Sequence, residues 1–234
     1  MGLGYHFMYM FKTLSALLTV STGLTFAQSE HVKRLDDAAI VMSEIMGTKD
    51  REIPQDLLNK SHCVVIVPGM KKGAFILGAK YGRGFISCRK EGGVGWSAPG
   101  GVRVEGGSAG LQIGVSETDV VMLVMNEGGA KKLLATKFTL GGDASAAAGP
   151  IGRTTTAETD AAMRAEILTW SRSRGLFGGV SLQGATMRED EKANQDLYGK
   201  PMKNSEIVLK GTPAPGPANK LLDLLNKYSS RKGA

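Results

Sequence analysis

The sequence predicts an α+β fold: a glycine-rich, strongly bent and mostly antiparallel β-sheet, barrel-like or sandwich-like, packed with N-terminal and C-terminal amphipathic helices. Apolar and polar residues alternate over residues 102–105, which places the apolar side chains on one face of a strand. Residues 120–125 form an unbroken apolar run, as expected for a strand covered on both faces. Glycine accounts for 32 of 234 residues and lies inside such apolar segments, where it marks bends and bulges.

Two segments repeat apolar residues at helical spacing. Leu35, Ala39 and Met42 do so within residues 30–47, and Leu221 and Leu225 do so near the C-terminus. Each apolar stripe either packs on the sheet or meets a membrane, and we favour packing for the first. Between them we expect a short helix at 53–58, strands at 62–67, 74–80 and 83–89, a helix at 127–136, a hairpin within 165–187 and a charged helix at 188–198.

Residues 1–27 have the features of a secretory signal. Lys12 supplies a positive charge, residues 14–24 are mostly apolar, and Thr25 and Ala27 are small residues before the expected cleavage point. The apolar run is short for a membrane span, although a retained N-terminal anchor remains the alternative. We therefore expect a signal peptide at 1–27, one folded domain at 28–210, a Pro/Gly linker with a final amphipathic helix at 211–234, and a periplasmic or secreted protein with peripheral membrane association.

The chain is basic, with a net charge of +7 and a pI of about 9.4. This balance favours anionic partners such as lipid head groups, although it also serves solubility. Basic residues lie at expected turns or on an exposed helix, where charge is well solvated. If the turns meet at one end of the sheet, these residues form a cationic rim. The candidate lipid-binding residues are Lys71, Lys72, Lys131, Lys132, Arg153, Arg172 and Arg174.

The candidates differ in their expected surroundings. Lys71 and Lys72 are expected on a loop that follows a turn at residues 68–69, and Arg172 is expected at the tip of the hairpin. Arg153 ends a segment rich in small residues, where its guanidinium could donate two hydrogen bonds to a phosphate. Any one of these clusters alone is typical of a solvated surface.

Catalysis has little support in the sequence. Ser108 lies in a G-x-S-x-G pattern, but a strand pattern follows it, whereas the nucleophile elbow requires a helix there. His31 and His62, the histidines beyond the signal segment, both precede Ser108, whereas in those hydrolases the histidine follows the serine. We therefore expect a non-enzymatic protein.

Metal, cofactor and nucleic-acid sites are not expected either. The histidines and cysteines lack the spacing of metal ligands, and no nucleotide-binding phosphate-loop motif occurs. Aromatic residues make up 6% of the chain and are not interleaved with basic ones, so platforms for base stacking are not indicated. Cys63 and Cys88 lie on expected strands, and the sequence leaves open whether they form a disulfide or remain two buried thiols.

Several blocks of the chain resemble a known family. They include GWSAP at 95–99, GGSAGLQIG at 106–114 and VVMLVMN at 120–126, followed by LGGDASAAAGPIGR at 140–153, ILTWSRSRGLFGGVSLQG at 167–184 and KANQDLYG at 192–199. Together they resemble the SYLF domain, also called the actin-binding Ysc-type domain, over residues 30–199. The resemblance implies lipid and phosphoinositide binding, and actin binding in some eukaryotic members.

The resemblance and the charge together lead to one expected function. We expect a lipid-binding protein of the cell envelope that docks on anionic phospholipid or phosphoinositide head groups through basic loops. The alternative is a structural or interaction protein of the periplasm without a lipid ligand. Because residues 1–27 resemble a signal, we do not expect actin as a partner.

Overall fold

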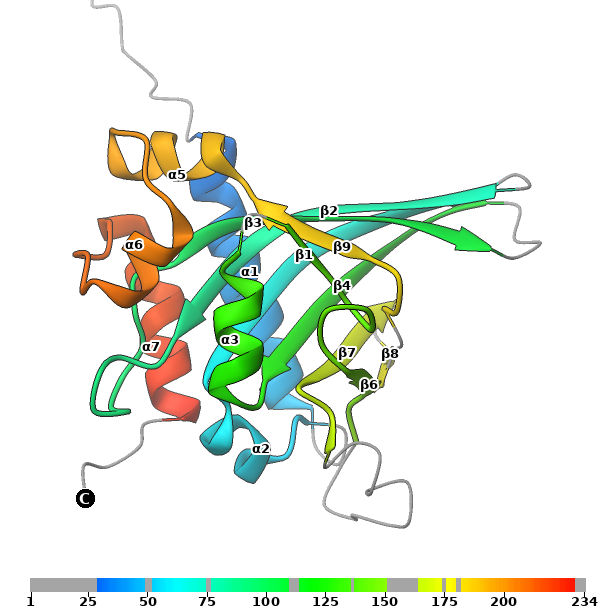
Figure 1. The fold of residues 1–234 in the computed structure, drawn as a ribbon, viewed down its shortest axis with the longest axis horizontal. Coiled ribbons are helices and arrows are strands. Elements are labelled where there is room, and N and C mark those ends of the chain that lie inside the picture. Colours follow the sequence, from blue (N-terminus) through cyan, green and yellow to red (C-terminus); the bar gives the residue numbers. More distant parts are fainter. Residues whose placement is uncertain are drawn as a thin grey trace, which may run out of the picture.

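A curled β-sheet with helices on both faces forms the fold (Figure 1). The computed structural model describes residues 29–48, 52–74, 77–109, 114–135, 137–150, 164–173, 176–179 and 182–229. The helices are α1 Glu30–Gly47, α2 Gln55–Lys60, α3 Glu127–Leu133, α5 Glu191–Tyr198, α6 Asn204–Leu209, the 3-10 helix η1 Gly216–Ala218 and α7 Asn219–Tyr228. The strands are β1 Cys63–Ala74, β2 Leu77–Cys88, β3 Gly100–Ala109, β4 Gly114–Val124, β5 Lys137–Thr139, β6 Ala146–Ala148, β7 Ile167–Ser173, β8 Leu176–Gly179 and β9 Thr186–Glu189.

The strands of the described chain form one sheet in the order β5-β9-β3-β2-β1-β4-β7-β6, with β8 added to β7. Neighbouring strands are antiparallel except for β6 and β7. The outer halves of β1 to β4 extend beyond the helices at the right of Figure 1. We call this projection the arm, and it comprises the described residues 70–74, 77–84, 104–109 and 114–118. The predicted α+β class with a bent, mostly antiparallel sheet is confirmed.

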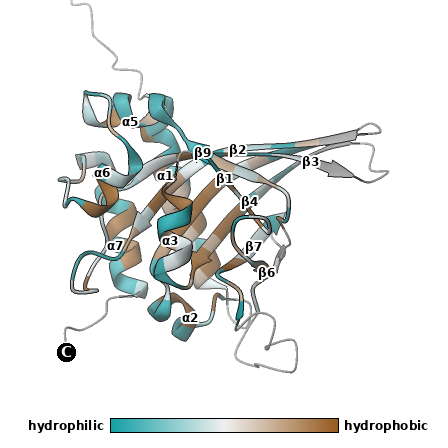
Figure 2. Ribbon diagram, in the orientation of Figure 1, coloured by the Kyte–Doolittle hydropathy of each residue, from teal (hydrophilic) through white to brown (hydrophobic). Residues whose placement is uncertain are grey.

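Alternate residues of the central strands enter two cores on opposite faces of the sheet. Along β1, Val64 and Ile66 face the core beneath α1 and α7, whereas Val65 and Val67 face the core beneath α3 and α6. The apolar run in β4 alternates in the same way, and Figure 2 shows these strands in brown. We call the two sides the α1 face and the α3 face. The prediction of a strand covered on both faces is confirmed.

Helix α1 spans the predicted residues 30–47, and its apolar stripe points inward. Leu35 and Met42 are buried, as are Leu221 and Leu225 of α7, and all four belong to one core. The alternative, in which either apolar stripe meets a membrane, is therefore wrong, because the sheet and the partner helix already cover both stripes. None of the described helices combines the length and apolar composition that a bilayer crossing requires.

The expected turn at residues 68–69 is a bulge inside one long strand. The pairing of β1 with β4 shifts between Val67 and Met70. Gly69 adopts a φ of 55°, and its N–H donates to Asp119 Oδ1 at 2.9 Å. The carboxylate thus satisfies the backbone group that the bulge leaves unpaired. As a consequence, Lys71 and Lys72 lie on a strand and not on the expected loop.

The strands expected at 74–80 and 83–89 form one continuous strand, β2. Tyr81 and Gly82 pair with β1 or β3 instead of turning. Glycine is required at this crossing because a Cβ at Gly84 would lie 1.9 Å from the carbonyl oxygen of Ile66. The glycines in β2 therefore allow close approach to the bulge of β1.

Candidate functional site

The described candidate cations lie in three separate places. Lys71 and Lys72 are on the arm, Lys131 and Lys132 are on α3, and Arg172 is on β7. Because these three places lie on different elements of the fold, the described candidates do not gather at a single cationic rim. Arg153 and Arg174 lie outside the described residues.

Arg172 joins the sheet to α1. Its Nη2 and Nε atoms donate to Asp119 Oδ2 at 2.6 and 2.9 Å, and its Nη1 atom contacts the carboxylate of Glu44 on α1. Asp119 is also the residue that binds the β1 bulge. Arg172 is thus neutralised twice within the chain, and its position indicates a structural contribution.

The two lysines of α3 also have acidic neighbours. Lys131 Nζ lies 2.7 Å from Glu127 one helical turn earlier, and Lys132 Nζ lies 3.1 Å from Glu166. Exposed ion pairs of this kind contribute about 0–1 kcal/mol to stability. Their main effect is to balance the charge of this part of the surface.

The arm carries three lysines, of which only Lys71 has an acidic residue directly opposite it. Strand pairing places Lys72 of β1 directly opposite Lys80 of β2, whereas Lys71 lies opposite Tyr81 and Glu117. Among the described residues, none of these lysines forms an ion pair within 4 Å. Burial, and then the ammonium group of Lys80, lower the pKa of Lys72. Like charges directly opposite each other destabilise a sheet, so this pair gains from an anion that the chain itself does not supply.

Lys80 is a candidate that the sequence did not reveal. Residues 81–82 resembled a turn, which separated Lys80 from Lys72 by an expected loop. Only the register of β1 and β2 shows that the two side chains share one sheet face. We call Lys71, Lys72 and Lys80 the arm lysines.

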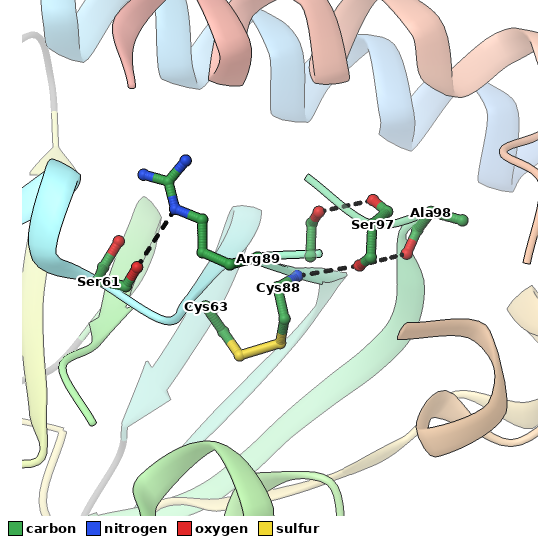
Figure 3. The surroundings of a disulfide bond; sticks show 7 residues. Ser61, Cys63, Cys88, Arg89, Ser97 and Ala98 are labelled. Carbon is green, nitrogen blue, oxygen red and sulfur yellow. Dashed lines mark hydrogen bonds between the residues drawn. A yellow bond between two sulfur atoms is a disulfide. The ribbon is translucent and has the colours of Figure 1, made fainter. Parts of the chain in front are cut away.

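A cavity of about 1200 Å³ lies at the other end of the sheet, beside a disulfide. Cys63 and Cys88 pair across β1 and β2 and form this disulfide, with the sulfur atoms 1.96 Å apart (Figure 3). The sequence had left the pairing open. Arg89 stacks on Trp96, with its guanidinium carbon 3.9 Å from the ring centre, and donates to the backbone oxygen of Ser61. These contacts join the segment that follows β2 to the segment that precedes β1.

The KANQDLYG segment contains buried anchors of the fold. Asn194 Oδ1 accepts from Gly101 N–H at 2.7 Å, and its Nδ2 donates to Asn204 Oδ1 at 2.8 Å and to Met202 O at 3.0 Å. The Tyr198 hydroxyl donates to Pro99 O at 2.7 Å, and burial raises the pKa of that hydroxyl. The motif thus fixes α5 and α6 to the start of β3.

The described residues offer little for catalysis or metal binding. His31 is buried and its Nε2 lies 3.0 Å from Asp196, which joins α1 to α5. Ser108 belongs to β3, and its side chain lies outside the described ones. No group of three or more histidine, cysteine or acidic side chains with metal-binding geometry occurs in the described part of the chain.

The fold defines a class of α+β domain: a curled, mostly antiparallel sheet with helices on both faces, buried polar contacts that hold the helices to the sheet, and a projecting arm that carries lysines. A family model named Ysc84 and described as "Las17-binding protein actin regulator" matches residues 105–228. This match covers more than half of the chain, so the chain belongs to the Ysc84 family, the SYLF domain that its motifs resembled.

Curated relatives agree with this assignment. The chain is 31% identical over 184 residues to the human SH3 domain-containing YSC84-like protein 1, and this match covers 78% of the chain and 53% of the relative. It is 34% identical over 181 residues to LAS seventeen-binding protein 3 of Saccharomyces cerevisiae, and this match covers 75% of the chain and 38% of the relative. Protein YSC84 of the same yeast is 32% identical over 188 residues. The chain thus spans about half or less of the length of these relatives.

Proposed function

We propose that this chain is a non-enzymatic lipid-binding protein that docks on anionic phospholipid head groups through the arm lysines. The observation that carries the proposal is the cross-strand pair Lys72–Lys80, which no acidic side chain of the described chain neutralises. The arm projects away from the helices (Figure 1), so a flat membrane can reach it. Near an anionic surface each basic residue contributes about 1 kcal/mol. Lys72 and Lys80 share one face of the arm and together support reversible attachment without a deep pocket, and Lys71 on the opposite face adds to the positive potential of the arm.

Neutralising the arm lysines is expected to weaken attachment to anionic vesicles by about 100-fold. The variant is Lys71→Gln/Lys72→Gln/Lys80→Gln, measured by co-sedimentation with phosphatidylcholine vesicles that contain or lack phosphatidylserine. Wild-type binding should require phosphatidylserine and fall steeply with salt, because exposed charges are screened.

A matched control removes three exposed lysines at the opposite side of the molecule. Lys200→Gln/Lys210→Gln/Lys220→Gln makes the same change in net charge near α5, α6 and α7, at the left of Figure 1. It should retain most of the vesicle binding. Equal losses in the two triple variants would show that net charge, and not the arm, drives attachment.

The alternative function is interaction with a protein partner without a lipid ligand. The family description, which names an actin regulator, favours this alternative. Co-sedimentation of the full chain with filamentous actin, beside the vesicle assay, separates the two. Binding to actin and to neither kind of vesicle would replace our proposal with this one.

We also propose that the chain is exported to the periplasm or secreted. The signal-like residues 1–27 support this proposal, and so does the Cys63–Cys88 disulfide, because disulfides persist mainly in oxidising compartments. Expression of the full chain in a Gram-negative host should yield a periplasmic protein that begins at Gln28 by mass spectrometry. A cytosolic product that retains residues 1–27 would contradict export.

A further inference from the structure

Four cationic residues lie side by side across four neighbouring strands at the base of the arm. Arg83 of β2 pairs with Arg103 of β3, Arg103 pairs with Arg188 of β9, and Arg188 pairs with Lys137 of β5. Directly paired residues project from the same face of a sheet. With strands about 4.8 Å apart, the four positions span about 14 Å. We call these four residues the arginine row.

The arginine row lies on the α1 face and is open to solvent. The residues that alternate with it, including Val102, Val104 and Phe138, are buried in the core of the α3 face. The side chains of Arg83, Arg103 and Arg188 are 29%, 39% and 41% exposed, and Lys137 is exposed as well. An anion from solvent can therefore reach all four.

Acidic side chains balance only part of this charge. Glu105 lies between two of the arginines, 3.5 Å from Arg103 Nε and 4.0 Å from Arg188 Nε, and Asp190 lies 3.5 Å from Arg83 Nε. Each of these distances is too long for a good hydrogen bond. Among the described residues, Arg103 Nε and Arg188 Nε are buried without a hydrogen-bond partner.

The arginine row lacks the close hydrogen-bond acceptors that Arg172 has. Arg172 makes hydrogen bonds of 2.6 and 2.9 Å to Asp119, so its donors are used within the chain. Arg83 donates from Nε to the Tyr81 hydroxyl at 2.5 Å. For the Nε atoms of Arg103 and Arg188, the described chain provides no hydrogen-bond partner. A row of like charges held in register without acceptors is costly, and an external anion removes that cost.

We propose that the arginine row binds a ligand with two or more neighbouring phosphate groups, from either a phosphorylated lipid head group or a soluble oligophosphate. A guanidinium matches a phosphate with two parallel hydrogen bonds, which an ammonium group cannot do. The spacing of the strands lets successive phosphates meet successive guanidinium groups. The lipid source rests on the proposed function above, whereas the soluble source does not.

The test uses the full chain with three soluble probes: inorganic tripolyphosphate, monophosphate and poly-L-glutamate. Titration calorimetry should show binding of tripolyphosphate that exceeds binding of monophosphate by at least about tenfold, since only the former spans two arginines. Arg103→Lys/Arg188→Lys keeps the charge and removes the bidentate geometry, so tripolyphosphate binding should fall by about 100-fold. Binding that survives this variant, or equal binding of poly-L-glutamate, would overturn the proposal.

A second variant tests the row by a gain of binding. Glu105→Gln removes the carboxylate between Arg103 and Arg188 and should tighten tripolyphosphate binding by about fivefold. The Lys200→Gln/Lys210→Gln/Lys220→Gln control should bind tripolyphosphate as the wild type does. Unchanged or weaker binding by Glu105→Gln, in a variant with a wild-type circular dichroism spectrum, would contradict the proposal.

Vesicles with and without phosphatidylinositol bisphosphate distinguish the two sources and the two proposals. Tripolyphosphate binding without vesicle binding would support the arginine row and overturn lipid docking. Binding to phosphatidylserine vesicles without tripolyphosphate binding would overturn the row and leave lipid docking intact. Selective binding to phosphatidylinositol bisphosphate that Arg103→Lys/Arg188→Lys abolishes would support both and identify the lipid head group as a source.

Discussion

Replacing Asn194 with leucine is expected to destabilise the protein by about 4 kcal/mol, because it removes the centre of a buried hydrogen-bond network. Asn194 is fully buried, and its amide accepts from Gly101 N–H and donates to Met202 O and Asn204 Oδ1. Leucine has a similar volume but leaves three polar groups without partners. Each buried unsatisfied group costs about 1–3 kcal/mol. Urea denaturation should show the loss as a lower midpoint.

The control for this variant is the next residue of the same helix. Gln195 is exposed on α5, so Gln195→Leu should change the free energy of unfolding by no more than about 0.5 kcal/mol. If both variants unfold at the same urea concentration, the network does not stabilise the fold. Vesicle binding gives a second readout, since Asn194 lies far along the sheet from the arm tip and should affect docking only through unfolding.

Local patterns predicted those elements whose signals lie within a few residues. Helix α1 matches the predicted residues 30–47 because its apolar stripe has helical spacing and Ser29 accepts a hydrogen bond from Val32 N–H at its start. The apolar run of β4 likewise indicated burial on both faces. In contrast, the β1 bulge depends on Asp119, 50 residues after Gly69. No local pattern around residues 68–69 separates such a bulge from a turn.

The candidate site was predicted only in part, because some of its residues meet through strand pairing between segments that are distant in the sequence. Lys71 and Lys72 are adjacent in the sequence, so their charge was evident, but Lys80 joins them only through strand register. The arginine row is a stronger example, because its members are far apart in the sequence and meet only through the pairing of β2, β3, β9 and β5. For the α3 lysines, the acidic residue four positions before Lys131 was a usable local signal.

Reduction of the Cys63–Cys88 disulfide is expected to lower the stability of the wild-type protein by about 3.5 kcal/mol, which corresponds to about 10 °C in Tm. The bond joins residues 25 positions apart and therefore restricts a sizeable loop of the unfolded chain. The folded chain gains little from the bond itself, because β1 and β2 already pair at these two positions. Thermal unfolding of the wild type with and without dithiothreitol measures the difference.

The Cys63→Ala/Cys88→Ala variant separates the cross-link from the packing of the sulfur atoms. Both cysteines are buried, at 0% and 4% exposure, so the variant also loses some contacts and should melt below the oxidised wild type. It should not respond to dithiothreitol, since no bond remains to be reduced. A wild-type Tm that is unchanged by complete reduction, confirmed by thiol labelling, would show that strand pairing alone holds this end of the sheet. The cross-link would then add no stability beyond that of the strand pairing.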